Sequence, residues 1–366
     1  MPDRGHQLNG KPPRGWKRIR EWFQGGREGR TETVRHAFPK ILQNEKPDLV
    51  WCHNLAGGEK WGWGEFLVSL ATAHAPVVWT LHDMWALGNG GQAYWEAGSV
   101  VESGRCKVEE DKHRQAGRAQ GAAVEGLTGS RVVSVCSEKG KHRVTLTAPS
   151  EWLAGLAGKI SGYPCRNLPN PIDLDVYRPG SREQARKRLG LPQEAFLVLA
   201  GADSLEDRRK GLDLLRSAWS SLPAQDGLLI LFGRHGISGP GTRYLGPIDS
   251  DAMMIHAYQA ADLYVHPARM ENASCQIQEA MACGTPTLAF ATGGNAELIQ
   301  AGQSGLLAAR VDAESLAAEL ERAWELGPRL EKMGGEARQR ALAIWNPDRL
   351  IRMWEETLRP GLSGPR

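Results

Sequence analysis

The chain has 366 residues, more than one ordinary domain holds, so two domains are expected. Hydrophobic residues make up 41% of the chain and charged residues 24%, a balance typical of a protein that buries a sizeable core. The 45 basic and 42 acidic side chains give a formal net charge of +3, which argues against a dedicated nucleic-acid binder. The sequence has no run of about 18 apolar residues that would predict a membrane-spanning helix.

The N-terminal region divides into two parts. Residues 1–15 are polar and rich in Gly and Pro, and we expect a disordered tail there. Residues 16–23 place aromatic and aliphatic side chains at near-helical spacing, with basic residues between them, before Gly25–Gly26 ends the pattern. Two interpretations fit this pattern. One is a basic helix lying on an anionic membrane surface, and the other is an ordinary helix packed on its own domain.

Strand and helix signals alternate through the rest of the first half. Short apolar runs predict buried strands at residues 48–52, 76–81 and 144–148, and residues 63–74 are expected to form a helix. Residues 86–130 show little periodicity, so long loops with room for one helix are expected there. After the strand at 144–148, Ser150 is expected to be a helix N-cap, with Glu151 in the first turn.

A turn cluster at residues 169–173 predicts an interdomain linker, and a second strand–helix series follows it. We expect strands at 196–200, 228–232, 263–266, 287–290 and 305–307, and helices at 212–219, 251–260, 275–283, 295–301 and 313–326. This alternation predicts parallel sheets covered on both faces, and hence an α/β chain of two Rossmann-like domains facing across a cleft. The expected domains are residues 16–172 and 173–345, with 346–366 as a helix crossing back to the first domain.

The six cysteines show no C-x-x-C pair, which suits neither a zinc site nor a disulfide framework. Free thiols in a reducing cytoplasm are expected, and we expect the chain to be cytoplasmic, with the basic N-terminal stretch as the candidate contact to the inner face of the membrane. The cysteines are Cys52, Cys106, Cys136, Cys165, Cys275 and Cys283.

Candidate ligand-binding residues follow the strand at 263–266, because open parallel sheets bind ligands at the carboxyl ends of their strands. Glu271 lies in the loop and Glu279 about two turns into the next helix. Two glutamates at this spacing are common on any solvated helix, so alone they are a weak indication of a binding site. The helix start also offers free amides that can hold a diphosphate, those of Ala273, Ser274 and Cys275.

The segment Glu271–Pro286, E-N-A-S-C-Q-I-Q-E-A-M-A-C-G-T-P, resembles the signature of the large retaining glycosyltransferase group with the GT-B fold, called family 4. The segment Trp79–Trp85, W-T-L-H-D-M-W, resembles the corresponding segment of family members that build bacterial surface polysaccharides, including colanic-acid-type enzymes. Four further landmarks agree, at residues 148–154, 169–173, 209–211 and 293–299. The resemblance covers roughly residues 45–350. It implies that the domain at residues 16–172 lies on the acceptor side and that the domain at residues 173–345 binds the nucleotide sugar.

The resemblance implies transfer of a sugar from a nucleoside diphosphate sugar to an acceptor hydroxyl, with retention, in polysaccharide or glycoconjugate biosynthesis. It implies that Glu279 binds the donor ribose, that Glu271 binds the donor sugar, and that Arg209 and Lys210 neutralise the diphosphate. His82 would face the transferred sugar, with its backbone stabilising an oxocarbenium-like transition state. His82 and Glu271 are therefore the candidate catalytic residues.

The acceptor is expected to be a saccharide or a lipid-linked saccharide, and His53, Asn54 and Asp83 are the candidate residues on its side. No metal or other cofactor is expected, because no Asp-x-Asp motif follows a strand at the required place. The family's leading strand and Gly-rich loop have no counterpart in residues 1–45, so the N-terminal domain is expected to be shortened. Two alternatives stay open: a GT-B enzyme of another class, such as an epimerase or phosphorylase, and a non-catalytic protein that binds nucleotide sugar or a partner transferase.

Overall fold

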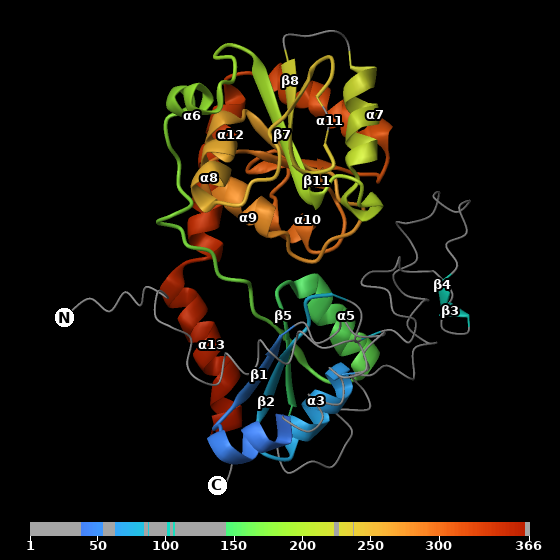
Figure 1. Cartoon of the computed structure of the whole chain (residues 1–366), viewed down its shortest axis with the longest axis vertical. Coiled ribbons are helices and arrows are strands. Elements are labelled where there is room, and N and C mark those ends of the chain that lie inside the picture. The colour runs from blue at the N-terminus through green and yellow to red at the C-terminus, as the bar shows by residue number, and fades with distance from the viewer. Residues whose placement is uncertain are drawn as a thin grey trace, which may run out of the picture.

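The structure is a computed structural model. It describes residues 38–53, 63–83, 87, 101–102, 105–106, 144–222, 227–236 and 238–362. Two halves, each built around a sheet, lie one above the other (Figure 1). We call residues 38–167 the four-stranded half and residues 182–344 the six-stranded half, after their sheets. Both sheets are parallel throughout, which confirms the expected α/β class with two Rossmann-like halves.

The four-stranded half has the strand order β1-β2-β5-β6. Of its two interior strands, β2 is buried along its whole length, as its apolar sequence V-V-W-T predicts for a strand covered on both faces. A separate pair, β3 (Val101–Glu102) and β4 (Arg105–Cys106), is antiparallel. The strands are β1 (Val50–His53), β2 (Val77–Thr80), β5 (Val144–Ala148) and β6 (Cys165–Asn167), and the helices are residues 38–45, α3 (Trp63–Thr72) and α5 (Glu151–Ser161).

The six-stranded half has the order β12-β11-β10-β7-β8-β9, so the direction of chain progress reverses between β10 and β7. Its strands are β7 (Phe196–Ser204), β8 (Gly227–Arg234), β9 (Thr242–Tyr244), β10 (Leu263–His266), β11 (Thr287–Phe290) and β12 (Gly305–Ala308). Its helices are α6 (Arg182–Leu189), η2 (Arg208–Lys210), α7 (Leu212–Ser221), α8 (Asp251–Ala260), α9 (Cys275–Ala282), α10 (Asn295–Leu298), α11 (Ala313–Leu326) and α12 (Arg329–Ile344).

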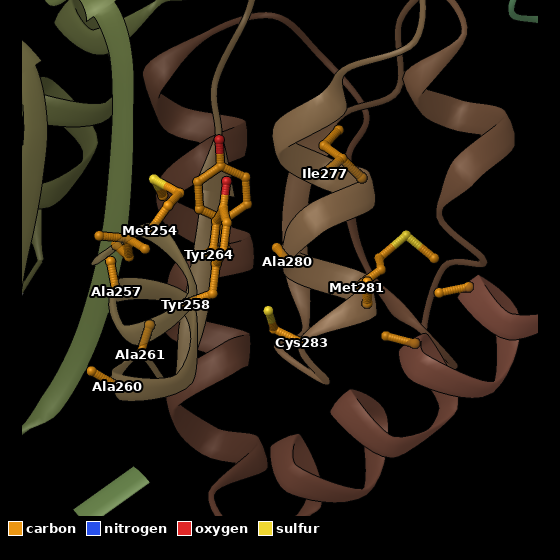
Figure 2. Packing of buried hydrophobic residues seen from close by; sticks show 14 of the residues in the cluster. Met254, Ala257, Tyr258, Ala260, Ala261, Tyr264, Ile277, Ala280, Met281 and Cys283 are labelled. Atoms are coloured by element: carbon orange, nitrogen blue, oxygen red, sulfur yellow. The ribbon is translucent and has the colours of Figure 1, made fainter. Parts of the chain in front are cut away.

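Apolar side chains cover both faces of the six-stranded sheet. Successive residues of β10 alternate between two clusters: Leu263 and Val265 belong to one, and Tyr264 belongs to the other. Figure 2 shows Tyr264 beside Tyr258 in the second of these clusters, facing α9. This packing fixes the position of α9 relative to the end of β10.

The last helix, α13 (Pro347–Leu362), leaves the six-stranded half and runs along the four-stranded half (Figure 1). The Trp354 ring meets the Trp51 ring edge-on, with centroids 5.8 Å apart. Arg166 donates a 2.9 Å hydrogen bond to the carbonyl of Glu356. None of the described helices combines the length and the apolar character that a membrane crossing requires.

Most of the expected elements lie within a few residues of their observed bounds. Eight described elements had no counterpart among the expectations, namely the helix at residues 38–45, β3, β4, β6, β9, α6, η2 and α12. The tail, the basic stretch at residues 16–23 and most of the 86–130 segment lie outside the described residues. Within the described part of the chain, Cys52, Cys275 and Cys283 are free thiols.

Candidate functional site

The predicted donor-side residues come together where the order of the six-stranded sheet reverses. β7 leads into η2, and the neighbouring β10 leads into the loop before α9. Parallel strands bring both connections to the same sheet edge, which is where open α/β sheets bind ligands. Arg209 and Lys210 of η2 therefore face the loop that carries Glu271.

Two cations share one carboxylate oxygen at this edge. Lys210 Nζ donates to Oε2 of Glu271, and Arg209 Nη1 lies 3.2 Å from the same oxygen. The Glu271 side chain is 13% exposed, against 22% for Lys210 and 35% for Arg209. Burial raises the pKa of Glu271, but Lys210, His266 and Arg209 together outweigh burial and hold that pKa below its ordinary value. The carboxylate stays ionised and keeps both cations beside the start of α9.

The loop after β7 is locked against the loop after β10. Gly211 has φ +69°, and a Cβ there would lie 1.8 Å from the carbonyl oxygen of Pro267. The amide of Arg269 donates to the carbonyl of Arg209 at 2.9 Å, and its guanidinium binds both carboxylate oxygens of Asp213 at 2.6 and 2.7 Å. Sequence reasoning missed Arg269, because an arginine in a loop carries no pattern that reveals its partner.

The second glutamate of the signature, Glu279, is held by a hydrogen bond from a buried tyrosine. The Tyr258 hydroxyl donates a 2.8 Å hydrogen bond to Oε2 of Glu279. Burial raises the pKa of Glu279 to about 6, against the lowering effect of the Tyr258 hydrogen bond, and Asp251 raises it further. Tyr264, whose ring meets that of Tyr258 edge-on at 5.4 Å, donates to Oε1 of Gln276 at 3.1 Å (Figure 2 shows the two tyrosines side by side). Tyr258 and Tyr264 are further residues that the sequence motifs did not reveal.

The helix α9, which follows Glu271 and contains Glu279, starts at the expected residue. Ser274 is the N-cap of α9 with no side-chain capping bond, and Cys275 is the first helical residue. A helix start leaves its first amides without partners inside the helix, and it carries partial positive charge. The amides of Ala273, Ser274 and Cys275 thus adjoin the carboxylate and cations of the preceding loops.

A pair of histidines in the four-stranded half forms the second part of the candidate site. His53 ends β1 and His82 follows β2, and Nδ1 of His53 lies 3.1 Å from Nε2 of His82. Burial lowers the pKa of both rings, and His53 lowers that of His82 further, so the pair is neutral near pH 7. Asp83 follows His82 and is half-buried. Asn54 lies outside the described residues.

The two groups of residues meet across the halves. The side-chain amide of Asn272 donates a 3.0 Å hydrogen bond to the backbone carbonyl of His82. Asn272 directly follows Glu271, so both candidate catalytic residues lie at one junction. Among the side chains that the structure describes, no three His, Cys, Asp or Glu residues are grouped to hold a metal ion.

Residues 181–340 match the family described as glycosyl transferases group 1. The chain is 30% identical to D-inositol 3-phosphate glycosyltransferase 1 of Catenulispora acidiphila, over 53% of this chain and 52% of that protein. It is 35% identical to D-inositol 3-phosphate glycosyltransferase of Mycolicibacterium smegmatis, over 37% of this chain and 34% of that protein. The chain therefore spans about half the length of the first relative and about a third of the second.

Solved structures share the arrangement of both halves. Sucrose-phosphate synthase from Thermosynechococcus elongatus superposes with a TM-score of 0.63 at 21% identity, covering 90% of this chain and 79% of that one. Anabaena HepE in complex with UDP-glucose gives a TM-score of 0.61 at 19% identity, covering 88% of this chain and 82% of that one. The protein therefore has the GT-B fold, and its residues 181–340 are similar to the family of glycosyl transferases group 1.

Proposed function

We propose that the chain is a glycosyltransferase that moves a sugar from a nucleoside diphosphate sugar to an acceptor hydroxyl, with retention of anomeric configuration. The observation that carries this proposal is the pair of cations, Arg209 and Lys210, bound to Glu271 beside the start of α9. A departing nucleoside diphosphate develops negative charge, and fixed cations with helix-start amides stabilise it where it forms.

Each half has its own task in this proposal. Glu279, buried and held by Tyr258, accepts hydrogen bonds from the ribose hydroxyls of the donor. Glu271 binds hydroxyls of the donor sugar, and the carbonyl of His82 faces the anomeric carbon as positive charge grows there. His53 and Asp83 lie near His82 on the acceptor side.

The bond changes follow from this arrangement. The bond between the anomeric carbon and the diphosphate oxygen breaks, and the acceptor oxygen bonds to the same face of that carbon. The acceptor proton passes to the departing diphosphate, so no other acid is required. Arg209, Lys210 and the α9 amides supply the positive charge, and the proposal includes no metal or other cofactor.

The wider role is proposed on the motif resemblance. We place the chain in family 4, near enzymes of surface-polysaccharide synthesis, with a saccharide or lipid-linked saccharide as acceptor. Its proposed location is the cytoplasm, with residues 16–23 against the inner face of the membrane.

Product analysis of the full chain tests the function. UDP-glucose is the first donor to use, because HepE, of the same fold, was solved with it, and inositol phosphate is one acceptor to use, after the name of the relatives. Formation of a glycoside in the presence of EDTA, with the donor's anomeric configuration seen by NMR, supports the proposal. Donor binding by calorimetry without transfer or hydrolysis of any nucleotide sugar would support the non-catalytic alternative instead.

A further inference from the structure

A set of contacts joins the two halves beside the candidate site. On the six-stranded side it uses Asn272, Gly294 and Glu297, and on the four-stranded side it uses the carbonyl of His82 and the first residues of α5 from Ser150 to Trp152. We call these residues the clasp. The loop of Glu271 and the start of α5 thereby meet at one place.

Asn272 is the centre of the clasp. Its side chain is buried, with 2% of the residue exposed, and both of its polar ends are used. The amide donates to the His82 carbonyl at 3.0 Å, and Oδ1 accepts from the Ser150 hydroxyl at 2.5 Å. Buried amides without partners are costly, so this side chain fits only when both partners from the other half are in place.

The backbone around Asn272 leaves no freedom for the loop. A Cβ at Gly294 would lie 1.8 Å from the carbonyl oxygen of Asn272 and 2.6 Å from Cβ of Ser150. The amide of Gly294 also donates to the carbonyl of Glu271 at 3.2 Å. The glycine allows three chain segments to touch, and a side chain there would push the halves apart.

Glu297 adds a charged contact. Its carboxylate accepts from the backbone amide of Glu151 at 2.9 Å and from that of Trp152. These amides are the first of α5, where a helix start attracts an anion. Arg340 holds the Glu297 segment by donating to the carbonyls of Glu297 and Leu298 at 2.6 Å each.

We infer that Asn272 is a positioning residue for sugar transfer, holding the His82 carbonyl in line with the donor-sugar loop by hydrogen bonds that cross between the halves. The inference rests on the proposed function. The proposed donor contacts, Glu279, Arg209 and Lys210, all lie in the six-stranded half. Loss of the clasp should therefore leave donor binding intact and misplace only the groups that act on the anomeric carbon.

Three variants separate the possibilities. Asn272→Ala removes both of its hydrogen bonds. Asn272→Asp keeps an acceptor for Ser150 but cannot donate to the His82 carbonyl. Ser304→Ala is the control, because its hydroxyl is equally buried and accepts a 2.9 Å hydrogen bond from Gln300 within one half.

We expect kcat to fall about 10- to 100-fold in both Asn272 variants, since small misplacements of reacting groups cost this much. UDP affinity measured by calorimetry, which also reports that the six-stranded half is folded, should stay at the wild-type value, and Ser304→Ala should keep wild-type kcat. Unchanged kcat in Asn272→Asp, or a parallel loss of UDP affinity, would overturn the inference.

Hydrogen exchange gives a readout independent of transfer. The amides of Glu151 and Trp152 should be protected in the wild type and should exchange faster in Asn272→Ala and in Glu297→Ala. If the wild-type chain transfers sugar from none of the donors, the proposed function is wrong and so is the positioning role of Asn272. The clasp itself is then judged by the protection of these two amides alone. Fast exchange in the wild type would instead show that the clasp does not hold in solution, whatever the turnover.

Discussion

The hydroxyl of Tyr258 donates a 2.8 Å hydrogen bond to Oε2 of Glu279 from the interior of the six-stranded half. Tyr258 is fully buried in α8, so its hydroxyl cannot turn to water instead. The bond stabilises the ionised carboxylate, while burial favours the neutral form and prevails, which leaves the pKa of Glu279 at about 6. The ionisation of Glu279 therefore changes within the range in which such a protein can be assayed.

Donor binding should weaken on acidification with a midpoint near pH 6. Ribose hydroxyls donate to a carboxylate more strongly than to a neutral acid, so the affinity for UDP is highest above pH 6 and falls below it. Calorimetric titrations between pH 5 and 8 measure this. Glu279→Gln should bind weakly and with a flatter pH dependence.

Replacing Tyr258 by Phe should shift that midpoint upward. The variant removes the one contact that lowers the pKa of Glu279, so the carboxyl protonates at a higher pH. Tyr163→Phe, in the four-stranded half, is the matched control and should keep the wild-type midpoint. A midpoint in Tyr258→Phe at or below the wild-type value would show that the hydroxyl does not act on Glu279.

The affinity for the diphosphate should depend on Lys210. Hydrogen bonds to charged groups contribute about 1.5–3 kcal/mol, so Lys210→Met should weaken UDP binding about 10- to 100-fold. Uridine lacks the phosphates, and its binding should not change. Lys187→Met, on an exposed position of α6, is the control. Equal losses for UDP and uridine would place Lys210 away from the phosphates.

Much of the site could be predicted because its signals are local. Glu271 and Glu279 stand at fixed spacing around one helix start, and the strand before that helix is a plain apolar run. Their positions relative to Arg209 followed from one rule of sheet topology. The partners of these residues could not be predicted, because Tyr258 and Asn272 act through contacts between segments far apart in the chain.

The helix α12 shows why some of the fold could not be predicted. It contains Gly334 and Gly335, residues that weaken a helix by about 1 kcal/mol each and so argue against one in the sequence. In the structure a Cβ at Gly334 would lie 2.1 Å from the carbonyl oxygen of Gly284, in the turn after α9. The glycine lets α12 pack closely on that turn, and tertiary packing thus overrides local helix propensity.

Gly211→Ala should destabilise the protein far more than Gly190→Ala. Both glycines have positive φ, +69° and +62°, where a Cβ costs about 1–2 kcal/mol. At Gly190 the nearest atom to that Cβ is Nη2 of Arg243, at 3.5 Å, so little is added to this strain. At Gly211 the Cβ would collide with the Pro267 carbonyl at 1.8 Å, so we expect a loss of about 3 kcal/mol or more.

Urea unfolding of the two glycine variants measures the difference in the free energy of unfolding. Because Gly211 ends the segment that carries Lys210, its variant should also lose UDP affinity, whereas Gly190→Ala should keep it. Equal destabilisation by the two substitutions would show that the loop after β7 has room to move away from Pro267.

His266 should make the folded state sensitive to acid. Its ring is buried at the end of β10, and burial lowers its pKa to about 4, with Glu271 acting in the opposite direction and Lys210 and Arg209 lowering it further. In the unfolded chain a histidine binds a proton below about pH 6.5. As the pH falls from 6.5 to 4, the unfolded state binds a proton at this histidine and the folded state does not. The free energy of unfolding therefore decreases over this window, by about 3 kcal/mol at its acid end.

The free energy of unfolding measured by urea titration at several pH values should fall more steeply for the wild type than for His266→Gln, which has no such proton to bind. Glu271 faces this ring, so the difference between the two curves reports His266 together with its effect on Glu271. Parallel curves would mean that the ring is protonated within the folded protein.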